Sequence, residues 1–129
     1  MLLAGAVWHA FPELDIYAYA GEEYQNPHWN FNFASPFAAN GLGNPDFVNI
    51  GCNTEFYGTG TGLTGCANST QLVREGTIGF WDNIYKGPFG RLAGGLQYAY
   101  VQRYSFNGIG GIAKANDNEF LTSLRYYPF

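Results

Sequence analysis

Large and small side chains alternate along much of this chain with a period of two residues. The clearest stretch runs from Leu92 to Phe106, where even-numbered positions are mostly large and odd-numbered positions are small or polar. This period places successive side chains on opposite faces of a β-strand, and the stretch is far longer than the usual strand of about 5–6 residues. We expect one aromatic face on this strand, formed by Tyr98, Tyr100, Tyr104 and Phe106.

Two β-hairpins and a last strand follow from the same pattern. The segment from Lys86 to Gly90 supplies a tight turn, because Gly and Pro favour chain reversal. A second turn is predicted at 11–13, and a loop rich in Gly and Asn at 107–118. The predicted strands cover residues 2–10, 14–24, 72–85, 92–106 and 119–129.

The segment 25–71 shows no clear period, and we expect a surface loop there that contains short strands such as 47–50. It holds the two cysteines, Cys52 and Cys66, whose spacing is too long for a CxxC redox pair. The two cysteines either form a disulfide, which requires an oxidising compartment, or remain two free thiols. The disulfide is favoured because free cysteines are usually buried, and this Gly- and Thr-rich loop offers little to bury them.

Composition supports an all-β class. Aromatic residues make up 19% and charged residues only 12%, and the chain contains 18 Gly. Aromatic side chains suit a pleated surface, whereas helical bundles need more Ala, Leu, Glu and Lys. We therefore predict one β domain over residues 1–129, with long antiparallel hairpins, arranged as a β-barrel or an open barrel-like sheet with a long disulfide-pinned loop.

Charge and motifs exclude several function classes. The net charge is −4 and no two basic residues are adjacent, so the chain lacks the clustered cations of a nucleic-acid-binding protein. The two histidines, His9 and His28, have no metal-ligand spacing around them, and we predict no metal site and no cofactor. No nucleophile elbow, phosphate loop or converging acid–base set occurs, so we predict no catalytic residues and no enzyme.

The last residues of the sequence carry a resemblance to a known family. Phe129, with Tyr127 two residues before it and Leu121 further upstream, resembles the C-terminal strand of bacterial outer-membrane β-barrel proteins. The resemblance implies an outer-membrane location, lipid as the surrounding partner, and a structural or passive-transport role. It also implies that the short turns face the periplasm and that the disulfide loop and 107–118 face outward.

Other readings stay open beside this resemblance. Five strands is an odd number and falls below the minimum of about 8 in single-chain bacterial barrels. The chain is then the C-terminal portion of a larger barrel, or a protomer that completes its sheet with other copies of itself. A hypothesis from a different class is a secreted, soluble β-protein that self-assembles or binds glycan through exposed Tyr and Trp side chains.

Overall fold

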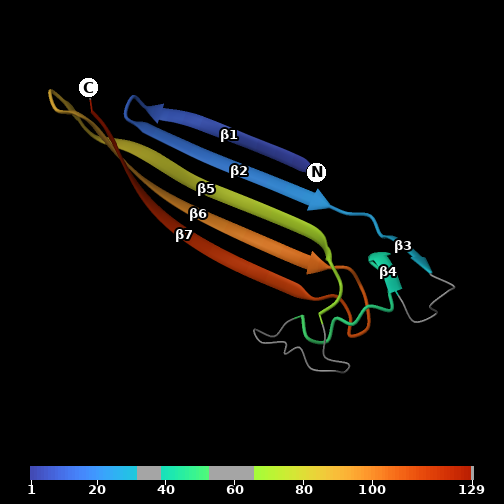
Figure 1. Ribbon diagram of the computed structural model, residues 1–129. Helices are drawn as coiled ribbons and strands as arrows, with labels where there is room; N and C mark the ends of the chain where they lie inside the picture. Colours follow the sequence, from blue (N-terminus) through green and yellow to red (C-terminus); the bar gives the residue numbers. More distant parts are fainter. Residues whose placement is uncertain (32–38, 53–65, 129) are drawn as a thin grey trace. The chain divides into compact units, whose positions relative to one another are not determined.

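The chain folds into β-strands joined by turns and loops (Figure 1). The computed structural model describes residues 1–31, 39–52 and 66–128, and no helix occurs in these ranges. The strands are β1 (Leu2–Phe11), β2 (Leu14–Tyr24), β3 (His28–Phe31), β4 (Ala39–Leu42), β5 (Thr70–Gly87), β6 (Gly90–Ser105) and β7 (Lys114–Tyr127).

Five of these strands form one antiparallel sheet in the order β1-β2-β5-β6-β7, and β3 pairs with β4 (Figure 1). The predicted all-β class and both predicted hairpins are confirmed. Gly90 closes the β5–β6 turn with a φ of 117°, a backbone conformation that glycine adopts without steric cost. Among the described residues β1 and β7 are the edges of the sheet, so the sheet is open there.

Two predicted loop regions differ from the structure. The prediction of a loop over 107–118 is wrong for its second half, because β7 begins at Lys114. Asparagine is uncommon in strands, yet Asn118 is held to β6 by the Tyr98 hydroxyl, which donates a 2.7 Å hydrogen bond to its Oδ1. Pairing with an existing strand therefore overrides the local preference of this segment.

The short strands between the hairpins also lie elsewhere than predicted. No strand forms at 47–50, where Val48 makes only an isolated parallel bridge to Ile109. The short strands are β3 and β4, in which His28 pairs with Leu42 and Trp29 with Gly41. These two strands pair with each other. Each has only four residues, which is too short for an alternating pattern in the sequence to predict a strand or its partner.

The predicted disulfide is confirmed. Cys52 and Cys66 are bonded through their Sγ atoms, and their Cα atoms lie 4.6 Å apart. Residues 53–65, which the bond encloses, lie outside the described residues. A disulfide forms and persists in an oxidising environment, so this bond indicates an extracytoplasmic compartment.

The chain divides into two compact units. One comprises residues 1–22, 74–101 and 117–129, and the other comprises 23–73 and 102–116. Within the described residues only Ala93, Ala99 and Phe106 are buried hydrophobic side chains. Many large hydrophobic side chains of the sheet are instead exposed, which is unusual for a protein surrounded by water.

Candidate functional site

The sheet has two chemically different faces. Cross-strand partners share a face, and consecutive residues of a strand point to opposite faces. The pair Trp8↔Ile16 therefore lies on one side of the β1–β2 hairpin, and the pair Val7↔Tyr17 lies on the other side. The hydrogen bond from the Tyr17 hydroxyl to Gln97 Oε1, at 2.9 Å, extends the second side across to β6. We call the Ile16 side the apolar face and the Tyr17 side the polar face.

The apolar face carries a shallow hollow lined by aliphatic and aromatic side chains. These side chains come from four strands and all lie in the first unit. Several are strongly exposed: Ile78 is 56% exposed and Phe120 is 68% exposed. A second hollow on the same face is lined by Phe80, Ile84 and Leu124, together with the polar side chains Asp82 and Thr122. The side chains of the first hollow are Leu14, Ile16, Ile78, Phe80, Leu96, Tyr98 and Phe120.

Aromatic side chains lie toward both ends of the strands on the apolar face. Trp8, opposite Ile16, lies near the turn between β1 and β2. Near the turn between β5 and β6, the Tyr126 hydroxyl donates a hydrogen bond to the Phe89 carbonyl. Tyr98 lies midway along β6, and Tyr100 follows it toward the other end of the strand. Rings with a polar group at one end suit a boundary between apolar and aqueous surroundings.

On the polar face, three aromatic rings lie against glycines of neighbouring strands. A Cβ atom added to Gly95 would stand 2.8 Å from the ring of Trp81, and one added to Gly79 would stand 2.5 Å from the Tyr17 ring tip. The ring of Tyr19 covers Gly5, its cross-strand partner, in the same way. Each ring therefore occupies the space that a side chain on its neighbour would fill, as in aromatic rescue of sheet glycines.

Two arginine side chains on the polar face lie against aromatic rings. The Arg125 guanidinium lies 4.0 Å from the centre of the Trp81 ring, and that of Arg91 lies 4.5 Å from the Tyr127 ring centre. Arginine over an aromatic face is attracted by the ring quadrupole. The face is thus polar and hydrogen-bonded, in contrast to the opposite face.

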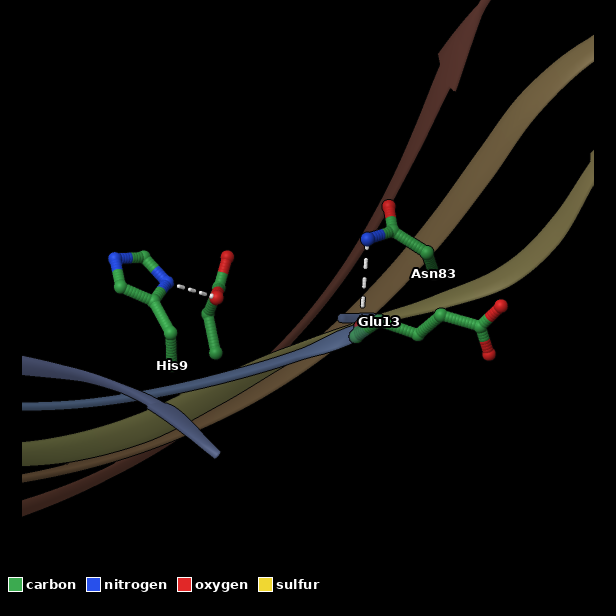
Figure 2. Close-up of polar contacts among 4 residues, drawn as sticks. His9, Glu13 and Asn83 are labelled. Carbon is green, nitrogen blue, oxygen red and sulfur yellow. Dashed lines mark hydrogen bonds and ion pairs between the residues drawn. The ribbon is translucent and has the colours of Figure 1, made fainter. Parts of the chain in front are cut away.

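Two further polar contacts lie beside the β1–β2 turn (Figure 2). His9 Nδ1 lies 2.5 Å from Asp15 Oδ1; the His9 side chain is largely exposed and the Asp15 side chain is partly exposed. The Glu13 carbonyl accepts two hydrogen bonds from Asn83, one from its backbone N–H at 2.9 Å and one from Nδ2 at 3.3 Å. These bonds fix the turn of the first hairpin to β5.

In the second unit, Asn49 connects the disulfide-bearing segment to the chain that follows β6. Its buried Nδ2 donates to the carbonyls of Phe106, at 2.8 Å, and Gly111, at 2.6 Å. Backbone bonds run beside it, from Asn49 N–H to the Ile109 carbonyl and from Ala67 N–H to the Val48 carbonyl. The base of the disulfide loop is therefore held by buried hydrogen bonds as well as by the covalent bond.

The structure places the predicted aromatic face only in part as expected. Tyr98, Tyr100 and Tyr104 occupy alternate positions of β6 on the side of the apolar face. Phe106 does not join them, because β6 ends at Ser105 and the Phe106 side chain is buried, 2% exposed. Its ring packs against Gly43, where an added Cβ atom would stand 2.6 Å from the ring.

The residues of the predicted C-terminal signature lie on the other side. Leu121 and Tyr127 lie on the same face of β7 as Arg125, which packs on Trp81 of the polar face. The apolar face of β7 is formed instead by the even-numbered Phe120 and Leu124. Phe129 lies outside the described residues.

Sequence reasoning missed the ring–glycine contacts of the polar face and the role of Asn49. The sequence shows that Asp15, Tyr17 and Tyr19 occupy every second position of one strand and so share a face. The same holds for Gly79 and Trp81 in another strand. Which glycine lies beneath which ring depends on the register between strands, and periodicity along one strand does not report it.

In the described ranges, no three or more His, Cys, Asp or Glu side chains are grouped so as to hold a metal ion. The described residues also form no helix that is long and apolar enough to cross a membrane. No protein-family model, curated protein or solved structure matches this chain.

Proposed function

We propose that this chain is a membrane-spanning part of an outer-membrane β-barrel protein with a structural or passive-transport role. The observation that carries the proposal is the exposed apolar face, which lies opposite a hydrogen-bonded polar face on the same five strands. In transmembrane barrels, lipid-facing apolar side chains alternate in this way with polar side chains that face the lumen.

Strand length and aromatic placement support the same environment. The five strands of the sheet have 10 to 18 residues each, and a tilted transmembrane strand needs about 9–11. Trp8 and Tyr126 flank the apolar side chains near the turns, and Tyr100 lies beyond them along β6. Such aromatic girdles mark the two interfaces of a bilayer.

Backbone hydrogen bonding then requires further strands beside this sheet. Unpaired N–H and C=O groups are costly in hydrocarbon, so a spanning sheet has to close. In the described structure β1 and β7 each lack a strand on one side. In the proposed function, the missing strands come from the rest of a larger barrel or from other copies of this chain.

A pair of adjacent positions in β5 tests the proposal. Ile78 lies on the apolar face and Thr77 on the polar face, so Ile78→Arg puts a charge into lipid and Thr77→Arg puts the same charge into the aqueous lumen. We expect Ile78→Arg to reduce folding into vesicles by about 2–4 kcal/mol and Thr77→Arg to have a much smaller effect. Flotation of the protein with phosphatidylcholine vesicles, read together with denaturant titration, measures both.

The alternative of a secreted, soluble protein uses the same apolar face. The unmodified chain and the same two variants distinguish it from the membrane proposal. A secreted protein that stacks its apolar faces in water would form a regular oligomer without detergent or lipid, and its assembly would be equally sensitive to Ile78→Arg. A detergent-free, monodisperse species that does not float with vesicles contradicts the membrane proposal. Dependence on detergent for solubility, with flotation of the unmodified chain, supports it.

A further inference from the structure

We infer that the polar face binds a neutral oligosaccharide on a platform formed by Tyr17 and Tyr19. The inference deepens the proposed function, on which it rests, by naming the class of solute that would contact this face. The two side chains line one hollow together with Val7, with Trp81, whose ring is covered by Arg125, and with polar side chains from three strands. All of the lining residues belong to the first unit.

The rings are arranged for stacking. Tyr17 and Tyr19 are successive residues on one face of β2, with ring centres 5.7 Å apart and planes inclined by 43°. One side of each ring is directed at a glycine of the neighbouring strand, Gly79 for Tyr17 and Gly5 for Tyr19. The rings therefore lie along the sheet, and Tyr19 is still 45% exposed. A pyranose ring has an apolar C–H face that packs on an aromatic ring of this kind.

Hydrogen-bonding side chains line the same hollow as the rings. Gln97 Oε1 accepts from the Tyr17 hydroxyl, and the Gln97 amide also carries two N–H donors. Ser123 and Asp15 line the same hollow and add a hydroxyl and a carboxylate. Stacking surface together with many small donors and acceptors is the chemistry that recognises a polyhydroxylated ring.

Charge on this face favours an uncharged ligand. Asp15 contacts His9, and the Arg125 guanidinium is stacked on Trp81, so the charges in and beside the hollow have partners within the protein. A nucleic acid would need several cations for its phosphates, and Arg125 is the one cation among the lining residues. A neutral oligosaccharide leaves these internal contacts intact.

Titration calorimetry of the full chain in a zwitterionic detergent without a sugar headgroup tests the inference. Maltohexaose and cellohexaose are the probes, with hexaglutamate as a charged control. We expect saturable binding of at least one hexasaccharide and none of hexaglutamate. Tyr19→Leu should weaken that binding by about tenfold or more, the effect expected when an aromatic anchor is truncated. Trp8→Leu, an aromatic substitution on the apolar face, is the matched control and should leave the affinity unchanged.

Absence of saturable binding by both hexasaccharides, or equal losses in Trp8→Leu and Tyr19→Leu, overturns the inference. Vesicle flotation of the same preparations keeps the two proposals apart. A chain that floats but binds no saccharide refutes the saccharide site alone. A chain that binds saccharide but does not float refutes the membrane assignment and retains the platform.

Discussion

Two glycines of β5 differ sharply in what surrounds them, although they are only three residues apart. A Cβ atom added to Gly79 would stand 2.5 Å from the Tyr17 ring and 2.8 Å from the Leu96 carbonyl oxygen, whereas one added to Gly76 would meet nothing within 4 Å. We expect Gly79→Ala to destabilise the sheet by about 1–3 kcal/mol, because a backbone atom cannot move aside as a flexible side chain does.

Gly76→Ala is the matched control in the same strand. It should be neutral or slightly stabilising, because alanine loses less conformational entropy than glycine when the strand forms. Denaturant midpoints of the two variants in one detergent measure the difference. Equal midpoints would show that Tyr17 does not lie over β5 as described.

Asn49 is the residue on which the base of the disulfide loop depends most. Its Nδ2 group donates to the carbonyls of Phe106 and Gly111, and the residue itself is 3% exposed. Asn49→Ala leaves these acceptors without their donor, at a cost of about 1–3 kcal/mol. Hydrogen exchange should show faster exchange at the Ile109 and Gly111 amides, which bond within this segment.

Asn118→Ala provides the comparison, because Asn118 is exposed and its bond from Tyr98 lies on the surface. We expect a change within about 0.5 kcal/mol for it. If both asparagine variants exchange at the same rates as the unmodified chain, the buried bonds of Asn49 contribute nothing to holding the loop.

The disulfide is expected to stabilise the second unit, to which both cysteines belong, and to have little effect on the first. The double variant Cys52→Ser, Cys66→Ser removes the disulfide, which joins residues 14 positions apart in the sequence. If the unfolded chain is treated as a random coil, losing this bond lowers the free energy of unfolding by about 3 kcal/mol. The loss should appear in the segment from Asn44 to Cys52 and around Asn68, whose side chain donates to the Phe106 carbonyl. Amides of β5 and β6 in the first unit should keep their protection in hydrogen exchange, and their early exchange would contradict this division.

The sequence predicted the long elements well because their signal is local. Alternation from Leu92 to Phe106 and the Gly–Pro turn before it are sufficient to define the β5–β6 hairpin to within a few residues. The start of β7 at Lys114 was not predictable in this way, because its Asn-rich residues adopt strand geometry only beside β6. Likewise, the contacts of Tyr17 with Gly79 and of Tyr19 with Gly5 depend on strand register, so the polar-face platform is visible only in three dimensions.

The open edges decide how whole molecules associate. In the described structure β1 and β7 present unpaired backbone groups along one side, and such edges pair readily with other strands. We expect copies of the chain to associate through β-pairing at these edges. Deleting residues 126–129 should weaken this association more than it disturbs the β5–β6 hairpin.

Analytical ultracentrifugation in detergent, compared with far-ultraviolet circular dichroism, separates the two effects. A shift toward monomer with retained β-sheet signal is the expected outcome for the truncated chain. Association unchanged by the deletion, or a full chain that is monomeric at all concentrations, would show that these edges are covered in another way.

The strand order also has a consequence for how the chain reaches its folded state. β1 with β2, and β5 with β6, are close in sequence, whereas the β2–β5 contact joins strands separated by the segment 25–69. Hairpins form in about 1–10 μs, and contacts across long sequence separations are slower because ordering the intervening segment is entropically costly. The two hairpins therefore form early, and their docking through β2 and β5 is the slow step. Because loop-closure entropy varies only with the logarithm of length, oxidation of Cys52 and Cys66 within that segment changes the docking rate little.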